Sequence, residues 1–307
     1  MGQSRFLFLG ITLVVLIAGH IFQPIPPHIE TIWAFALILI VGIPHGAVDH
    51  VSFRAQYPVH PIWFYVGYMS LVGLYLLSWI SFPAFSISIF LLLSAFHFGQ
   101  SQFSDLSKIP KWVFVIMAGS WGTSILSGLI FYHFESIEQL LLQSPDLSQM
   151  AVVLNYEWFD GIWRGSTIVA FGGLVMAYMG GYIGKPRLGY EIAIFCLIHI
   201  CFWVLPLLVG FCVYFVVWHS AKVMGEDYGI IRSRKPSLTF WGFVKLLIPF
   251  TLFSIFGITM IIAISLLGWI QVSEILMVLV MLSILTLPHS IIMDGFYRQL
   301  YPSKPSL

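Results

Sequence analysis

The stretch Ile43-Pro44-His45-Gly46-Ala47-Val48-Asp49-His50 stands at the end of a long apolar run in this chain of 307 residues. Three later apolar runs also end in a histidine, at His97, His219 and His289. Each histidine is followed within eight residues by an acid, and these acids are Asp49, Asp105, Asp227 and Asp294. The fold and the function must both explain why four histidines share this position.

The composition indicates a membrane protein. Hydrophobic residues make up 59% of the chain and charged residues 9%, whereas soluble domains carry about 25% charged residues. The net charge is +1 and the basic residues are scattered, so we expect no nucleic-acid partner. Cys196, Cys201 and Cys212 lie in apolar runs without C-x-x-C spacing, which favours free thiols.

The apolar runs predict an all-α polytopic membrane protein with about ten transmembrane helices. A membrane-spanning helix needs about 20 apolar residues. Windows of that length predict a single integral membrane domain over residues 1–307. Its predicted spans are 5–22, 30–48, 62–80, 83–99, 111–131, 166–183, 189–205, 207–224, 241–267 and 273–296.

The distribution of positive charge orients these helices. With ten helices and the N-terminus in the cytoplasm, thirteen Lys and Arg residues fall in the cytoplasmic loops and ends, and Arg164 alone falls outside. Merging the two spans that Pro206 separates, or the two on either side of residues 81–83, would scramble this bias. We therefore expect both termini in the cytoplasm. All four histidines then lie at cytoplasmic ends of helices that run from outside to inside.

Histidine within a membrane is costly unless it is paired or coordinated. One interpretation is that each histidine bonds a nearby loop carbonyl. The other is a metal site, because neutral imidazoles bind Fe, Cu, Zn or Ni and helices of a bundle commonly present ligands inward. On this second interpretation the metal ligands are His45, His97, His219 and His289.

The acids and one further histidine have possible roles around such a metal. A ligating imidazole usually donates its other N–H to a carboxylate or carbonyl. Asp49 and Asp294 are the first candidates for that role, and Asp105 and Asp227 are also candidates, although each could equally be a solvated helix end. His50 is a possible extra ligand or proton carrier, but it lies about 140° around an ideal helix from His45.

Four motifs taken together resemble the Brp/Blh family of membrane β-carotene 15,15′-dioxygenases. They are Gly42 to His50, Phe96-His97-Phe98-Gly99, Trp218-His219-Ser220, and Leu287-Pro288-His289 with Asp294. The resemblance implies that the histidines bind Fe²⁺, that O₂ is activated there, and that central cleavage of β-carotene gives two retinals. It implies no catalytic side chain beyond the metal site.

Two positions depart from the family pattern. Asp105 lies further from its histidine than we expect, and Val223 stands where some relatives carry another histidine, one turn after His219. If that histidine is a required ligand, His289 or His50 is the first candidate to replace it.

A carotenoid dissolved in the bilayer would enter an apolar tunnel, because pockets for such ligands are lined mainly by apolar and aromatic side chains. Aromatic residues that flank two of the motif histidines could line this tunnel or could simply pack in the membrane. They are Phe96, Phe98, Phe211, Tyr214, Phe215 and Trp218.

Two other classes of membrane protein also use intramembrane histidine. A proton-coupled transporter without a metal would work without O₂. A haem-binding redox protein needs facing pairs of axial histidines, often from mid-membrane, which fits four histidines at one interface poorly. We favour the carotenoid oxygenase, in a bacterial inner membrane and in contact with lipid.

Overall fold

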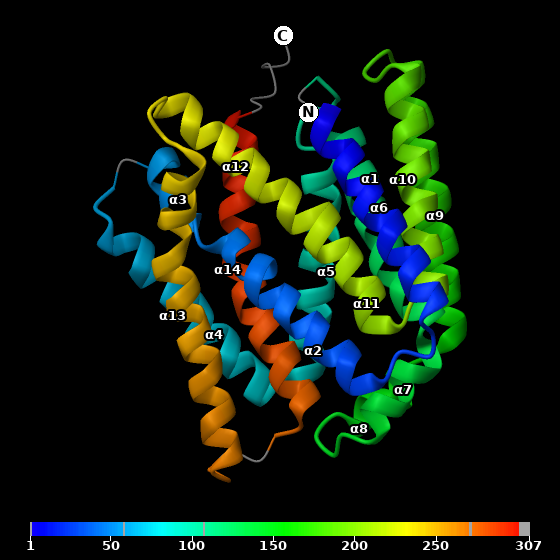
Figure 1. The fold of residues 1–307 in the computed structure, drawn as a ribbon, viewed down its shortest axis with the longest axis vertical. Coiled ribbons are helices and arrows are strands. Elements are labelled where there is room, and N and C mark those ends of the chain that lie inside the picture. The colour runs from blue at the N-terminus through cyan, green and yellow to red at the C-terminus, as the bar shows by residue number, and fades with distance from the viewer. Residues whose placement is uncertain (1, 58, 107, 270–271, 301–307) are drawn as a thin grey trace. The chain divides into compact units, whose positions relative to one another are not determined.

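The computed structural model describes residues 2–57, 59–106, 108–269 and 272–300. Within these ranges every regular element is a helix and none is a strand (Figure 1). The chain forms two compact units. Unit 1 contains Met1–Val48 and Ala193–Thr259, and unit 2 contains Asp49–Ile192 and Met260–Leu307. The predicted all-α class is confirmed.

In the described part of the chain, nine helices are long and apolar enough to cross a membrane, and a shorter apolar helix, Phe6–Ile21, precedes them. The nine are Pro27–Arg54, Ile62–Ser81, Pro83–Gln102, Lys111–Tyr132, Tyr156–Met179, Lys185–Val204, Leu207–Arg234, Phe240–Leu266 and Ile275–Gly295. Nine of the ten predicted spans each overlap one of these nine helices, and the first, 5–22, overlaps the shorter helix Phe6–Ile21. The chain is therefore a polytopic membrane protein. The orientation of the termini stays a prediction, and residues 301–307 lie outside the described ranges.

Proline separates the neighbouring helices that the sequence left close together. Helix α4 ends at Ser81 and α5 begins at Pro83, while α10 ends at Val204 and Pro206 precedes α11. Proline suits the start of a helix because its missing N–H has no intrahelical partner there. Both divisions predicted from the charge pattern are therefore present.

One predicted span begins earlier than expected. Helix α9, Tyr156–Met179, includes ten residues that the sequence pattern assigned to a loop before residue 166. The side chain of Asn155 accepts a hydrogen bond from the backbone N–H of Trp158, at 3.0 Å, and so caps the helix at this earlier point. Within this added part, Asp160 and Arg164 lie one helical turn from each other and form an ion pair, with 2.6 Å between Oδ1 of Asp160 and Nε of Arg164.

Unit 1 is built around two helices whose backbone changes character midway. Helix α2 passes into the π-helical segment η1 and the short 3-10 turn η2, while α11 passes into the π-helical segment η3 and then α12. The elements of unit 1 are α1 Gly2–Ile21, α2 Pro27–Leu37, η1 Ile38–Gly42, η2 Pro44–Gly46, α11 Leu207–Cys212, η3 Val213–Ser220, α12 Ala221–Arg234, the end of α10 and most of α13, Phe240–Leu266. Glu30 of α2 accepts a hydrogen bond from the backbone N–H of Leu208, at 2.8 Å, which ties the two broken helices together.

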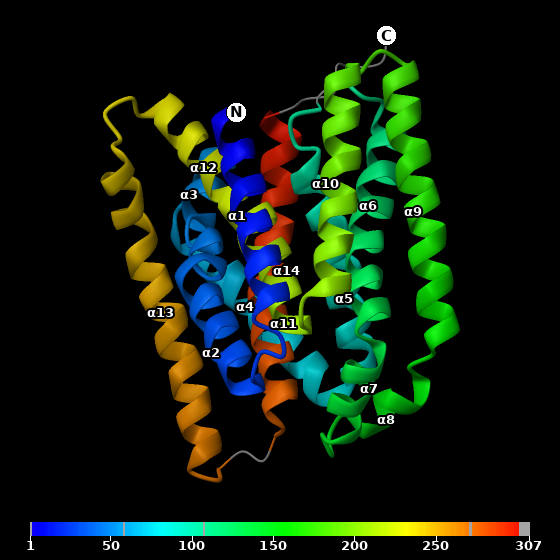
Figure 2. The ribbon, with the colours of Figure 1, turned by 45° about the vertical axis from the view of Figure 1, so that its right-hand side comes forward.

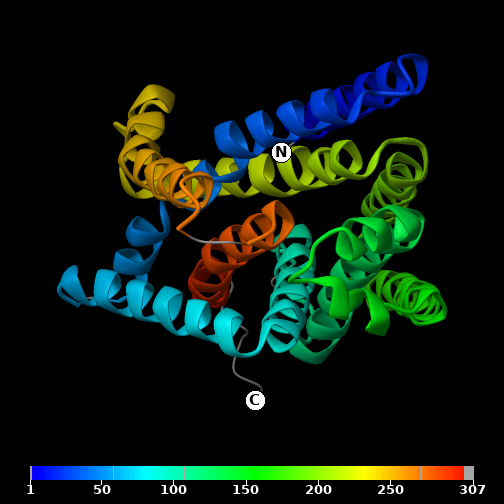
Figure 3. The same cartoon turned by 90° about the horizontal axis from the view of Figure 1, so that it is seen from below.

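Unit 2 contains longer regular helices. Its elements are α3 Asp49–Gln56, α4 Ile62–Ser81, α5 Pro83–Gln102, α6 Lys111–Tyr132, α7 Phe134–Leu142, α8 Ser148–Val153, α9 Tyr156–Met179, the start of α10 Lys185–Val204, and α14 Glu274–Leu300. Helix α6 lies between α5 and α9 (Figure 2), and α14 packs against α3, α4 and α5 (Figure 3).

Small residues bring α5 and α6 into close contact. A methyl group added at Gly99 would overlap the carbonyl oxygen of Ala118, and one added at Gly122 would overlap that of Ala95. Such close approach of backbones is typical of membrane helices with small residues four apart. His97 is two residues from both Ala95 and Gly99, about 200° around the helix. The contact with α6 therefore fixes one face of α5 and leaves His97 on the other.

Candidate metal centre

The first pair of histidines lies in unit 1. The rings of His45 and His219 are buried, with centroids 5.4 Å apart and planes at 81°. His45 is on η2, which Ile43 alone separates from the π-helical segment η1, and His219 is on the π-helical segment η3. The π-helix is rare and appears mostly as short interruptions, frequently at functional sites. Both histidines of this pair thus depend on irregular backbone.

Contacts within unit 1 fix the orientation of both rings. The Nδ1 atom of His45 donates a hydrogen bond to the carbonyl of Gly42. The Phe215 ring stacks on His219, with centroids 5.8 Å apart, and meets His45 edge-on at 5.6 Å. Because a carbonyl can only accept, the proton of neutral His45 is on Nδ1 and its lone pair is on Nε2.

The second pair lies in unit 2. The ring centroids of His97 on α5 and His289 on α14 are 5.0 Å apart, and both side chains are buried. Nδ1 of His289 donates to Oδ1 of Asp49 at 2.8 Å, and Asp49 is only 2% exposed. A carboxylate behind an imidazole holds its tautomer and raises its basicity, so Nε2 of His289 carries the lone pair.

A second polar contact joins the same two helices beyond this pair. Gln100 on α5 donates from Nε2 to Oδ1 of Asp294 on α14, at 2.8 Å. Gln100 follows His97 by three residues and Asp294 follows His289 by five. The bond therefore fixes the two helices close to the histidines they carry. The acid with which His289 is bonded is Asp49, which comes 240 residues before it in the sequence.

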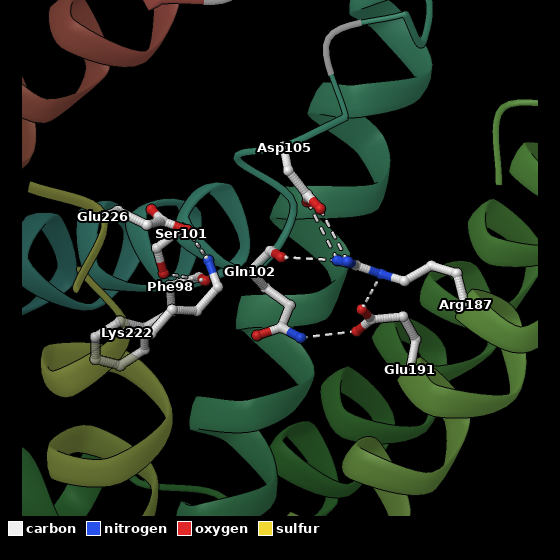
Figure 4. Close-up of polar contacts among 8 residues, drawn as sticks. All are labelled: Phe98, Ser101, Gln102, Asp105, Arg187, Glu191, Lys222 and Glu226. Atoms are coloured by element: carbon white, nitrogen blue, oxygen red, sulfur yellow. Dashed lines mark hydrogen bonds and ion pairs between the residues drawn. The ribbon is translucent and has the colours of Figure 1, made fainter. Parts of the chain in front are cut away.

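A partly buried ionic network contacts the end of α5. Arg187 of α10 donates to both carboxylate oxygens of Asp105, at 2.9 and 3.2 Å, and its Nε lies 2.5 Å from Oε1 of Glu191 (Figure 4). Gln102 completes the network, because its side-chain amide donates to Oε2 of Glu191 at 2.7 Å. Asp105 is thus paired with a cation, in a contact that joins α10 to the end of the helix carrying His97.

The remaining predicted residues lie on α3, α5, α11, η3 and α12. Asp227 is buried on α12, and His50 is half-buried on α3 with its ring edge-on to Phe64, at 6.4 Å. Val223 is fully buried on α12. Of the predicted tunnel residues, Phe96 and Phe211 are half-buried and the others are buried: Phe98, Tyr214, Phe215 and Trp218.

Sequence reasoning missed several residues that support the histidines. The sequence signal that could have identified them is a polar residue within an apolar helix, as at Gln100, Glu191 and Thr12. Arg187 entered only the count of loop charges.

The donor set of the histidine pairs suits a metal, because imidazole is a common ligand of iron and other transition metals. Nevertheless, among the described residues neither unit gathers three or more His, Cys, Asp or Glu side chains that could hold an ion. That all four histidines bind one metal stays a prediction.

Residues 36–297, which include all four histidines, match the family model described as β-carotene 15,15′-dioxygenase. The chain belongs to this family. It is also 29% identical over 203 residues to the β-carotene 15,15′-dioxygenase of the uncultured marine bacterium 66A03, in a match that covers 62% of this chain and 66% of that relative. No solved structure matches the chain. The family predicted from the four histidine motifs is confirmed, and α1 lies outside the matched residues.

Proposed function

We propose that this protein cleaves the central 15,15′ double bond of β-carotene, or of a related carotenoid, with O₂ and releases two molecules of retinal. The observation that carries the proposal is the pair of buried, facing imidazoles in each unit, inside the residues that match the family. The reaction balances with one O₂ per carotenoid. The carbon–carbon double bond is broken, and each new end receives one oxygen as an aldehyde.

We propose Fe²⁺ as the cofactor, with the predicted histidines His45, His97, His219 and His289 as its ligands. When bound, iron supplies the one-electron and O₂ chemistry that side chains lack. The chain contributes orientation. The Gly42 carbonyl and the Asp49 carboxylate fix the protons of His45 and His289 on Nδ1, so that the lone pair on Nε2 of each would be available to the metal.

The aromatic residues beside the histidines would bind the polyene and exclude water. Phe211, Phe215 and His219 form a continuous stack in unit 1, with centroid distances of 5.2 and 5.8 Å. In unit 2 the buried Phe98 follows His97 directly. We propose that these residues border a carotenoid tunnel open to lipid, in a protein of the bacterial inner membrane.

The test is expression in cells that accumulate β-carotene, with carotenoid and retinal measured by chromatography. The unaltered chain should consume β-carotene and produce two retinals for each molecule lost. Alanine at any of the four histidines should lower retinal formation about a thousandfold or more, or ~4 kcal/mol of activation free energy. H28A is the control, because His28 is exposed on α2. A well-folded unaltered chain that leaves β-carotene unchanged would contradict the proposal.

A further inference from the structure

We propose that Thr12 of α1 is a positioning residue for the histidine pair of unit 1 and that it acts through Trp218. The proposal rests on the proposed function in taking His45 and His219 as working residues. Helix α1 lies outside residues 36–297, so the matched family region does not contain this contact.

Thr12 is unusual within its helix. Most large side chains of α1 are exposed, including those of Ile11 and Leu13 on either side, whereas Thr12 is 0% exposed. Its Oγ1 donates to the carbonyl of Phe8 at 2.8 Å and accepts a hydrogen bond from the indole Nε1 of Trp218 at 2.9 Å. A buried indole N–H without an acceptor costs free energy, so Thr12 provides what Trp218 requires.

Trp218 lies in an irregular part of the backbone, next to a histidine of the pair. It directly precedes His219 in η3, a π-helical segment whose geometry is seldom sustained over a long run. The Phe8 ring meets Trp218 edge-on, with centroids 5.9 Å apart. The contacts with α1 therefore hold η3 on the Trp218 side, while Phe215 stacks on His219. Rotation of η3 about its axis would move Trp218 and His219 together. By holding Trp218, Thr12 therefore sets the direction in which the His219 ring faces His45.

The simpler role for a helical threonine is to bond its own helix. Thr31 of α2 has this role. Its hydroxyl donates to the carbonyl of Pro27, four residues earlier, at 2.9 Å, and its side chain is exposed. Thr12 makes the same local bond and the distant one. The two threonines are thus a matched pair, and T31V is the control for T12V.

The experiment measures hydrogen–deuterium exchange of peptides covering residues 213–220, together with retinal formation, in the full chain purified in detergent. T12V should speed exchange in η3 about tenfold, as a free-energy change of ~1.4 kcal/mol would, and should lower retinal formation. T12S should restore both because it keeps the hydroxyl. T31V should change neither. W218F removes the donor, so adding T12V to W218F should have little further effect.

Two results would overturn the role of Thr12. One is equal exchange in η3 for T12V and T31V, and the other is faster exchange with unchanged retinal formation. If T12V does not fold, the comparison of W218F with W218F/T12V and the behaviour of T12S decide the matter. Should the unaltered chain leave β-carotene untouched, the proposed function fails, and the exchange data still decide whether Thr12 holds η3.

Discussion

The two histidine pairs reach similar ring spacings, 5.4 Å in unit 1 and 5.0 Å in unit 2, by different means. In unit 1, π-helical backbone, a glycine carbonyl and aromatic stacking orient His45 and His219. In unit 2, regular helices carry His97 and His289, and a carboxylate orients the second ring. Backbone shape therefore controls one pair, and charged and polar side chains control the other.

This difference predicts different weaknesses. Removal of a charged or polar side chain should disturb unit 2, because Asp49, Gln100 and the Arg187 network support its pair. In unit 1 the partner of His45 is a backbone carbonyl, which side-chain truncation cannot remove. In unit 1 a larger side chain near the π-helical segments should disturb the histidine pair.

The largest effect on stability should come from Arg187 in unit 2. R187A would leave the Glu191 carboxylate, which is 0% exposed, without its cation. Breaking a buried ion pair from one side costs about 3 kcal/mol or more. The free energy of unfolding, measured by denaturant titration in detergent, should fall by this amount. K185A is the control, because Lys185 is exposed two residues earlier. Equal stability of R187A and K185A would show that the network does not support α5.

Asp49 should have the next largest effect. D49A removes the acceptor for Nδ1–H of His289, and loss of such a partner typically weakens metal binding about 10–100-fold. Titration of the purified metal-free protein with Fe²⁺ under anaerobic conditions measures the change. D160A, which breaks the ion pair with Arg164 on α9, should leave affinity unchanged. Unaltered Fe²⁺ affinity in D49A would remove the basis for the carboxylate's role in unit 2.

Gly42 should show the smallest effect and tests unit 1. A methyl group there would come within 2.8 Å of Cε1 of Phe215 and 3.3 Å of Cγ2 of Ile38. Overpacking of this kind costs about 1–2 kcal/mol of folding free energy. Retinal formation should also fall, because the displaced Phe215 ring stacks on His219. The double variant G42A/F215L should recover part of the lost folding free energy because the smaller side chain makes room, but not retinal formation, because it loses the ring that stacks on His219. G10A is the control, since nothing lies near that position. Full activity in G42A would mean that the Phe215 ring is not held in place.

The sequence predicted those features that depend on local pattern. Apolar runs and loop charges located the membrane helices, and Pro206 and Pro83 marked two boundaries correctly. Histidine at the end of apolar runs identified the residues that pair. The start of α9 was misplaced because a capping residue, Asn155, lengthens the helix beyond its apolar part.

Features that depend on contacts far apart in the sequence could not be predicted in this way. The acid closest to His289 in the sequence is Asp294, yet Asp294 accepts from Gln100, and Asp49 bonds His289. Such partner choice is decided by helix packing, to which residue spacing gives no access. The π-helical segments η1 and η3 were also missed, because one residue added to a helical turn leaves no mark on an apolar pattern.

The most direct test of the account is the iron content of three purified chains, measured after anaerobic loading with Fe²⁺ and removal of excess metal. The three are the unaltered protein, H45A/H219A in unit 1 and H97A/H289A in unit 2. If both histidine pairs hold the metal, the unaltered chain retains iron and each double variant loses it. Retention of iron by either double variant, at the level of the unaltered chain, would contradict the account.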